Sequence, residues 1–150
     1  MRDRTITLFN LHKASGLWYP TVLNNVSLNA VHADNATANA GIVNADVTEA
    51  IIRVSAEQSV TDAGSGNIKR YAGSKEYAKL ENPAAYFTFT PEQDFFMEGD
   101  YGSAEPVSDD EYDDFDGGFC DAMNRKRDGV YVIQSAAYYS LIPHFEIGGR

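Results

Sequence analysis

The residues with the most evident chemical potential are carboxylates that gather in one part of the chain. Residues 91–121 contain twelve acids and no Lys or Arg, whereas the remainder has ten acids against twelve bases. Such a segment repels a polyanion, because nucleic-acid binding depends on neutralising phosphates with Lys and Arg. It suits either a solvated surface, the usual role of a charge run, or a patch that docks on a basic partner or keeps DNA at a distance.

The acids between Asp109 and Asp116 do not match a calcium-binding loop. An EF-hand requires oxygen ligands at alternate positions, Gly at the sixth position and Glu at the twelfth. Placing Gly118 sixth puts Phe115 third and Gly117 fifth, where ligands belong. We therefore predict no metal site in this segment.

Nucleophiles and metal-binding side chains occur singly elsewhere in the chain. The histidines, His12, His32 and His144, fall in separate predicted elements, and no HExxH or CxxC spacing occurs. Cys120 lies among acids, which disfavour its thiolate. Residues 64–66 (GSG) have no phosphate-binding pattern around them, and no GxSxG is present. We predict no catalytic residue, no cofactor and no enzymatic activity.

The acidic segment also carries the pattern of a helix that would position its charges. Ser108 and Glu111 have the spacing of a capping box. Apolar residues then recur at helical intervals and form one stripe: Tyr112, Phe115, Phe119 and Met123. Because residues 117–118 (GG) weaken a helix, one kinked helix or two short helices both fit. We predict an acidic helical insertion near 103–127.

Charged residues at the two ends of this insertion form the candidate interface. Acids suit the first turn of a helix and bases its last turn, because of the helix dipole. The candidates are Asp109, Asp110, Asp113, Asp114, Arg125, Lys126 and Arg127. The acids among them would dock on the basic groups of a partner.

Most other segments alternate in the manner of β-strands. The predicted strands cover residues 5–11, 17–23, 26–28, 50–55, 86–90, 95–97, 130–134 and 144–147. We predict a break at Asn24-Asn25, an edge position for Pro20, and a hairpin joining 86–90 to 95–97. A short helix with Ser74 as its N-cap covers 74–80.

Two segments, 32–46 and 61–68, have the composition of mobile loops. Together with the strand pattern they predict a mainly β fold. We expect one domain over residues 1–150, a small β-barrel or sandwich of about seven strands with long loops and one or two short helices inserted.

Composition limits the setting in which such a domain works. No apolar run is long enough to cross a membrane, and the charged start MRDRTITLFN lacks the pattern of a signal peptide. The single cysteine cannot form an intrachain disulfide, which is typical of a reducing compartment. We expect no membrane association.

Short motifs occur at both ends of the chain and between them: TITLFN at 5–10, WYPTVLNNV at 18–26, SKEY at 74–77, FTF at 87–89 leading into EGD at 98–100, VYVI at 130–133 and HFEIGG at 144–149. Together they resemble a group of small proteins encoded in the structural gene clusters of tailed bacteriophages. The resemblance implies a virion protein of the neck, of the head-closure (stopper) or head–tail connector type.

The same resemblance implies a small β-barrel that assembles into a homo-oligomeric ring. Its partners would be other phage neck and tail proteins, with DNA passing nearby without specific binding. The protein would reside in the virion, and in the host cytoplasm during assembly. A tail-completion or minor capsid protein is the alternative within this class.

A small-ligand or carbohydrate-binding β-sandwich is the alternative from a different class. Exposed aromatic side chains are common in sugar sites, and Trp18, Tyr138 and Tyr139 are the candidates. Salt separates the two classes, because charge-dependent docking weakens as salt rises.

Overall fold

The computed structural model describes residues 3–31 and 47–150, and the predicted loop at 32–46 lies outside these residues. The elements are β1 (Asp3–His12), β2 (Leu17–Val31), β3 (Val47–Arg53), β4 (Ser59–Thr61), β5 (Ile68–Tyr71), α1 (Ser74–Tyr77), η2 (Pro83–Ala85), β6 (Tyr86–Phe87), β7 (Phe95–Glu98), β8 (Val107–Ser108), η3 (Asp109–Tyr112), α2 (Gly118–Lys126), β9 (Val130–Tyr139) and β10 (His144–Gly149).

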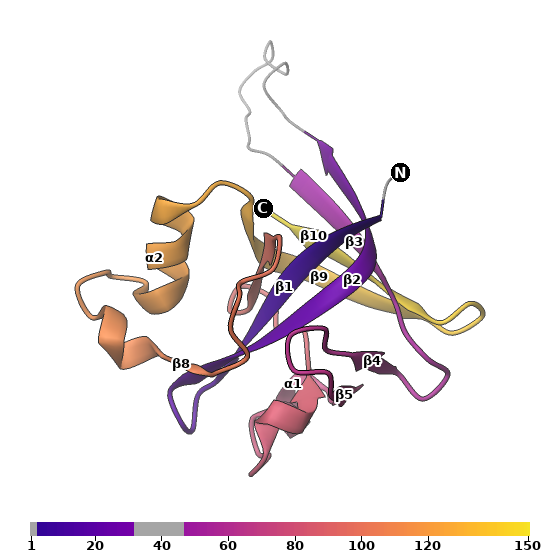
Figure 1. The fold of residues 1–150 in the computed structure, drawn as a ribbon, viewed down its shortest axis with the longest axis horizontal. Helices are drawn as coiled ribbons and strands as arrows, with labels where there is room; N and C mark the ends of the chain where they lie inside the picture. The colour runs from indigo at the N-terminus through magenta and orange to yellow at the C-terminus, as the bar shows by residue number, and fades with distance from the viewer. Residues whose placement is uncertain (1–2, 32–46) are drawn as a thin grey trace.

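Six antiparallel strands form a closed barrel in the order β1-β7-β9-β10-β3-β2, and pairing of β2 with β1 completes the circuit (Figure 1). The short strand β8 adds to β2 through Leu17 and Trp18. The predicted mainly β fold of barrel type is therefore confirmed.

Alternation along the strands fills the barrel with apolar side chains. Ile6 and Leu8 of β1 point inward, while Phe9 belongs to a separate cluster outside the wall. Residues from both sheets share the inner core: Ile6, Leu8, Leu23, Val26, Ala50, Ile52, Val60, Phe87, Phe89, Phe96, Ile133, Phe145 and Ile147. Such close packing supplies most of the folding free energy of a small domain.

A second sheet, in the order β4-β5-β6, closes one end of the barrel together with α1. We call residues 54–94 the plug, because Phe87 and Phe89 pack into the barrel core from there. The predicted hairpin between 86–90 and 95–97 is wrong: β6 runs parallel to β5, whereas β7 pairs with β1 and β9. Local alternation shows that both segments are extended, but not which strands they pair with.

Two smaller predictions are also corrected. Ser74 is the first residue of α1 rather than its N-cap, which is Gly73, and its hydroxyl accepts a hydrogen bond from Thr90. The predicted break at Asn24-Asn25 is a bulge within a continuous β2. Asn25 has φ 59°, and the register with β1 shifts between Arg4 and Ile6. An Asn tolerates this left-handed conformation better than most residues do.

Pro20 lies inside β2, opposite Phe9 of β1, and its other side faces the plug rather than a strand. Its carbonyl oxygen accepts a hydrogen bond from Lys69 Nζ at 2.9 Å. The predicted edge character thus holds locally, because no ladder partner here requires the N–H that proline lacks.

Candidate assembly surfaces

The acidic insertion, residues 99–129, connects β7 to β9 and lies against the outside of the barrel (Figure 1). Its two helical segments, η3 and α2, match the predicted alternative of two short helices. Phe119 of α2 meets Phe9 with ring centroids 5.3 Å apart and Phe95 at 5.8 Å. Phe9 and Phe95 themselves stack at 4.8 Å. The aromatic stripe predicted from the sequence therefore fixes the insertion to the barrel wall.

The Asp109 carboxylate holds the insertion in place through internal hydrogen bonds and is not a free surface charge. Its Oδ1 accepts hydrogen bonds from Trp18 Nε1 at 2.8 Å and from the Phe119 N–H at 2.9 Å. Gly118 has φ +68°, and a Cβ there would overlap the Asp109 carboxylate, so this position requires glycine. The predicted capping box is not formed, because Ser108 makes no side-chain capping bond.

The other predicted acids face solvent. Asp110, Asp113 and Asp114 are exposed, and the first two line a shallow recess of about 370 Å³ with Asp116 and Phe115. Within residues 3–31 and 47–150, no three His, Cys, Asp or Glu side chains lie in a group that could hold a metal ion.

The three predicted cations lie in the same insertion as the acids. Arg125 Nε is 3.1 Å from Asp121 Oδ2. Lys126 Nζ lies 5.6 Å from the ring centroid of Phe115, and Arg127 lies 5.8 Å from that of Tyr101. These cation–π contacts leave the charged groups at the surface, where they are worth about 0.5–1 kcal/mol.

The turn between β9 and β10 forms a second projection that the sequence patterns did not single out. Leu141 is 95% exposed and Ile142 is 74% exposed. Tyr139 stacks on His144 at 5.0 Å, and His144 Nδ1 lies 2.7 Å from the carbonyl oxygen of Ile142. A hydrogen bond with Glu146 raises the pKa of His144. The sequence feature that could have predicted this projection is the pair of large aliphatic residues, Leu141 and Ile142, in a turn.

This hairpin tip and the acidic insertion project from opposite sides of the barrel (Figure 1). The predicted sugar-binding aromatic set is not assembled at either place. Trp18 is 3% exposed and packs against Phe95 under the insertion, whereas Tyr138 packs on Phe145.

Two buried acids stand out as possible chemical groups. Asp94 accepts hydrogen bonds from Asn10, the N–H groups of Leu11 and Thr90, and Gln93. Burial raises the pKa of Asp94 to about 6, although these bonds oppose the shift. Since every oxygen is occupied by a donor from the chain itself, the arrangement joins β1 to the plug.

Asp62 fastens the plug to β2 in a different way, through an ion pair. Its carboxylate lies 3.4 Å from Lys69 Nζ and accepts the N–H of Val22 at 2.8 Å. Burial raises the pKa of Asp62, but these hydrogen bonds and the Lys69 charge bring it below its ordinary value. Asp62 lies in the segment 61–68, so the predicted loop there is a tight turn held from inside.

Cys120 of α2 lies next to Phe119, among the acids that surround it in the sequence. Burial first, and then the nearby acids, raise its pKa to about 11, so the thiolate is scarce at neutral pH.

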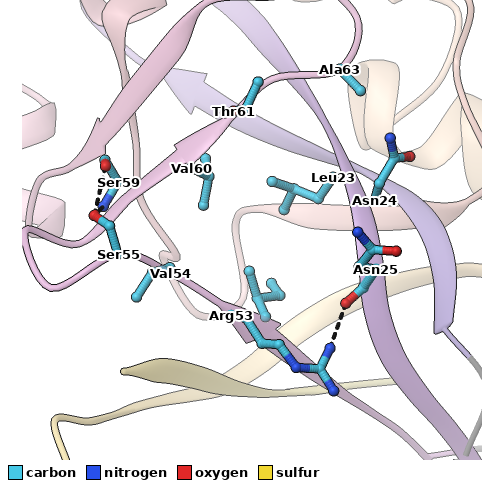
Figure 2. Close-up of a pocket in the computed structure, with 11 residues that line it drawn as sticks. Leu23, Asn24, Asn25, Arg53, Val54, Ser55, Ser59, Val60, Thr61 and Ala63 are labelled. Carbon is cyan, nitrogen blue, oxygen red and sulfur yellow. Dashed lines mark hydrogen bonds between the residues drawn. The ribbon is translucent and has the colours of Figure 1, made fainter. Parts of the chain in front are cut away.

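A recess of about 440 Å³ lies between β2, β3 and β4, and Figure 2 shows its lining side chains. Arg53 lines this recess and donates to the carbonyl oxygen of Asn25 at 2.6 Å. The remaining polar lining consists of amides and hydroxyls, including Ser55 and Ser59. Such a lining offers hydrogen bonds without an acid–base pair.

The fold and these surfaces define a small closed antiparallel β-barrel with an acidic insertion and an apolar hairpin tip. The chain belongs to a family of unknown function, DUF6751, whose profile matches residues 1–150. No curated protein and no solved structure matches the chain. Among the residues that the structure describes, no helix is long and apolar enough to cross a membrane.

Proposed function

We propose that this chain is a virion structural protein of a tailed phage, acting in the neck as a head-closure or head–tail connector protein. It assembles into a ring and docks onto portal-side and tail-side partners. Support comes from the resemblance at both ends of the chain and from a small closed barrel, the architecture that the resemblance implies. The protein works in the virion and passes through the host cytoplasm during assembly.

The observation that carries this proposal is the exposed hairpin tip. Leu141 and Ile142 are both largely exposed to water, although burying an aliphatic side chain is worth about 1.5–3 kcal/mol. Exposed apolar groups at the end of a projecting hairpin favour a contact with another protein surface. This contact would be made with a further protein chain in the assembled particle.

The exposed acids of the insertion suit a site beside DNA. Asp110, Asp113 and Asp114 repel phosphates, so a lumen lined with them lets DNA pass without sticking. Their alternative role is docking onto the basic groups of a partner, including Arg125, Lys126 and Arg127 of a neighbouring copy. Asp109 is excluded from either role by its internal hydrogen bonds.

Deleting the gene from a phage that encodes this chain tests the proposal. We expect DNA-filled heads that leak and fail to join tails, with the defect repaired when the chain is supplied from a plasmid. Complete heads with closed necks, accompanied by defective tails, would instead indicate a tail-completion protein. Normal infectious particles would overturn the proposal.

A further inference from the structure

We propose that the tip of the β9–β10 hairpin docks into a recess between the β1–β2 turn and α1 of a second copy of this chain. The inference rests on the proposed function, because it names the contact by which the ring is built. It joins two different surfaces of the chain.

The tip has the chemistry of an inserting group. Its exposed aliphatic side chains, Leu141 and Ile142, follow a strand segment without charge, since residues 130–143 contain no Asp, Glu, Lys or Arg. The stacked pair Tyr139 and His144 supports the turn from below. A short supported turn loses little conformational entropy when it docks.

The recess has the complementary chemistry. Leu11, Tyr77 and Ala78 give it more apolar than polar surface, although Ser74, Thr90 and Gln93 also line it, and its volume is about 240 Å³, enough for an aliphatic side chain. Lys13 and Lys75 also line it, and no acid does. The uncharged tip of an approaching copy therefore meets no carboxylate in the recess itself.

The other two recesses described above suit an aliphatic group less well. The one beside η3 is lined by four acids, Asp109, Asp110, Asp113 and Asp116. The one in Figure 2 has apolar residues in its lining too, but its amides, hydroxyls and Arg53 would lose hydration beneath an aliphatic side chain. Of the three, only the recess at α1 exposes more apolar than polar surface.

The two surfaces are also placed for a repeating contact. In Figure 1 the β9–β10 hairpin extends to the right, whereas the turn after β1 lies at the lower left and α1 lies at the bottom. A contact between two different surfaces repeats from copy to copy and closes into a ring when the rotation allows it. The acidic insertion lies on the receiving side, so an approaching tip without acids avoids repulsion there.

Complementary variants test this head-to-tail contact. Leu141→Asp removes the tip, and Ala78→Trp fills the recess; both positions are exposed in the single chain. We expect each change to raise the concentration needed for self-association at least about tenfold. Ile68→Asp is the matched control, because Ile68 is 67% exposed and belongs to neither surface.

Mixing the two variants gives the sharper result. The Leu141→Asp chain keeps a working recess and the Ala78→Trp chain keeps a working tip, so the mixture should form one-to-one heterodimers that grow no further. Native mass spectrometry measures this, with circular dichroism to check each fold. Assembly of Leu141→Asp like the wild type, or a mixture without heterodimers, would overturn the inference.

A disulfide cross-link locates the contact directly. In a Cys120→Ser background, we expect a mixture of Leu141→Cys and Ala78→Cys chains to cross-link on oxidation. Leu141→Cys linking to itself would mean a two-fold contact between tips and would overturn the inference.

The same link, sought in particles purified from complemented phage, separates this inference from the proposed function. Particles that contain the doubly substituted chain without the link overturn the contact and leave the neck role standing. Particles without the chain overturn the neck role, while the purified chains still decide the contact.

Discussion

The barrel carries two appendages that both pack aromatic rings against it and that differ in the polar contacts holding them. The plug is tied to β1 and β2 by buried polar groups, centred on Asp94 and on the Asp62–Lys69 pair. The insertion is held mainly by rings, with Phe119 of α2 between Phe9 and Tyr112, and the buried-side polar contacts described above for it are those of Asp109. Polar bonds have one satisfied geometry, whereas stacked rings tolerate small shifts.

The difference suggests a division of roles between the two regions. A polar fastening holds the plug in one position, and the recess at α1 is built on it. An aromatic fastening uses the inner face of the insertion and leaves its outer face free for charges. Each prediction below tests one side of this contrast.

The largest effect is expected at Lys69. Lys69→Met keeps most of the side chain's shape but leaves the buried Asp62 without its counter-ion. Removing one partner of a buried ion pair costs about 3–5 kcal/mol of unfolding free energy. Urea unfolding measures the loss, and the double variant with Asp62→Asn should recover part of it. A double variant that is less stable than Lys69→Met would contradict the role given to the pair.

A smaller effect is expected at Asp94, whose partners all donate hydrogen bonds. Asp94→Asn places an amide N–H against one of these donors, which costs about 1–3 kcal/mol at neutral pH. The measurement is urea unfolding of both proteins, with exposed Asp110→Asn as the control.

The difference in unfolding free energy between the wild type and Asp94→Asn should depend on pH, and the pKa of Asp94 gives the direction of the change. Burial raises the pKa of Asp94 from 3.8 to about 6, so the folded state binds this proton more tightly than the unfolded state does. The protonated Asp94 carboxyl contributes fully to the unfolding free energy below pH 3.8, and this contribution is lost as the pH rises through about 6. The advantage of the wild type over Asp94→Asn should therefore shrink between these values, and an advantage that grows would contradict the assignment.

In the insertion, Asp109→Asn should lower the unfolding free energy less than the changes at Lys69 and Asp94 do. The amide oxygen can still accept from Trp18 Nε1 and the Phe119 N–H, so only the charge is lost. We expect a loss of under about 1.5 kcal/mol, with a change in Trp18 fluorescence. Asp109→Ala leaves both donors unpaired and should be more damaging, and equal losses for the two variants would count against the hydrogen bonds.

The contrast between the two regions also shows how far sequence patterns reach. Alternation predicted the strands around Ile6 and Phe145, and the helical stripe predicted that Phe119 and Met123 are buried. These signals are local, because each residue's face follows from its neighbours in the chain.

Sequence patterns could not predict contacts between residues that lie far apart in the chain. Asp109 is separated by 91 residues from Trp18, and Asn10 by 84 from Asp94, so neither pairing leaves a local pattern. The exposed tip was missed for a related reason, since Leu141 and Ile142 have the types expected of a core. Only the placement of their turn outside the barrel reveals them.

The smallest effect on stability, and the most informative one on function, is expected for the exposed acids. The triple variant Asp110→Asn, Asp113→Asn, Asp114→Asn leaves Asp109 intact, so the aromatic fastening is untouched and the melting temperature should not change measurably. Loss of three charges should instead impair particle assembly or the passage of DNA, because the insertion then attracts phosphates more and basic partners less. The matched control is Glu49→Gln, Glu57→Gln, Glu81→Gln, which removes the same charge from exposed positions outside the insertion. Infectious yield and DNA ejection measure the outcome, and raising salt above about 0.1 M, where screening acts beyond about 10 Å, should reduce the difference between the two triple variants. Equal yields from the acid triple, the control triple and the wild type would show that these acids only keep the surface hydrated.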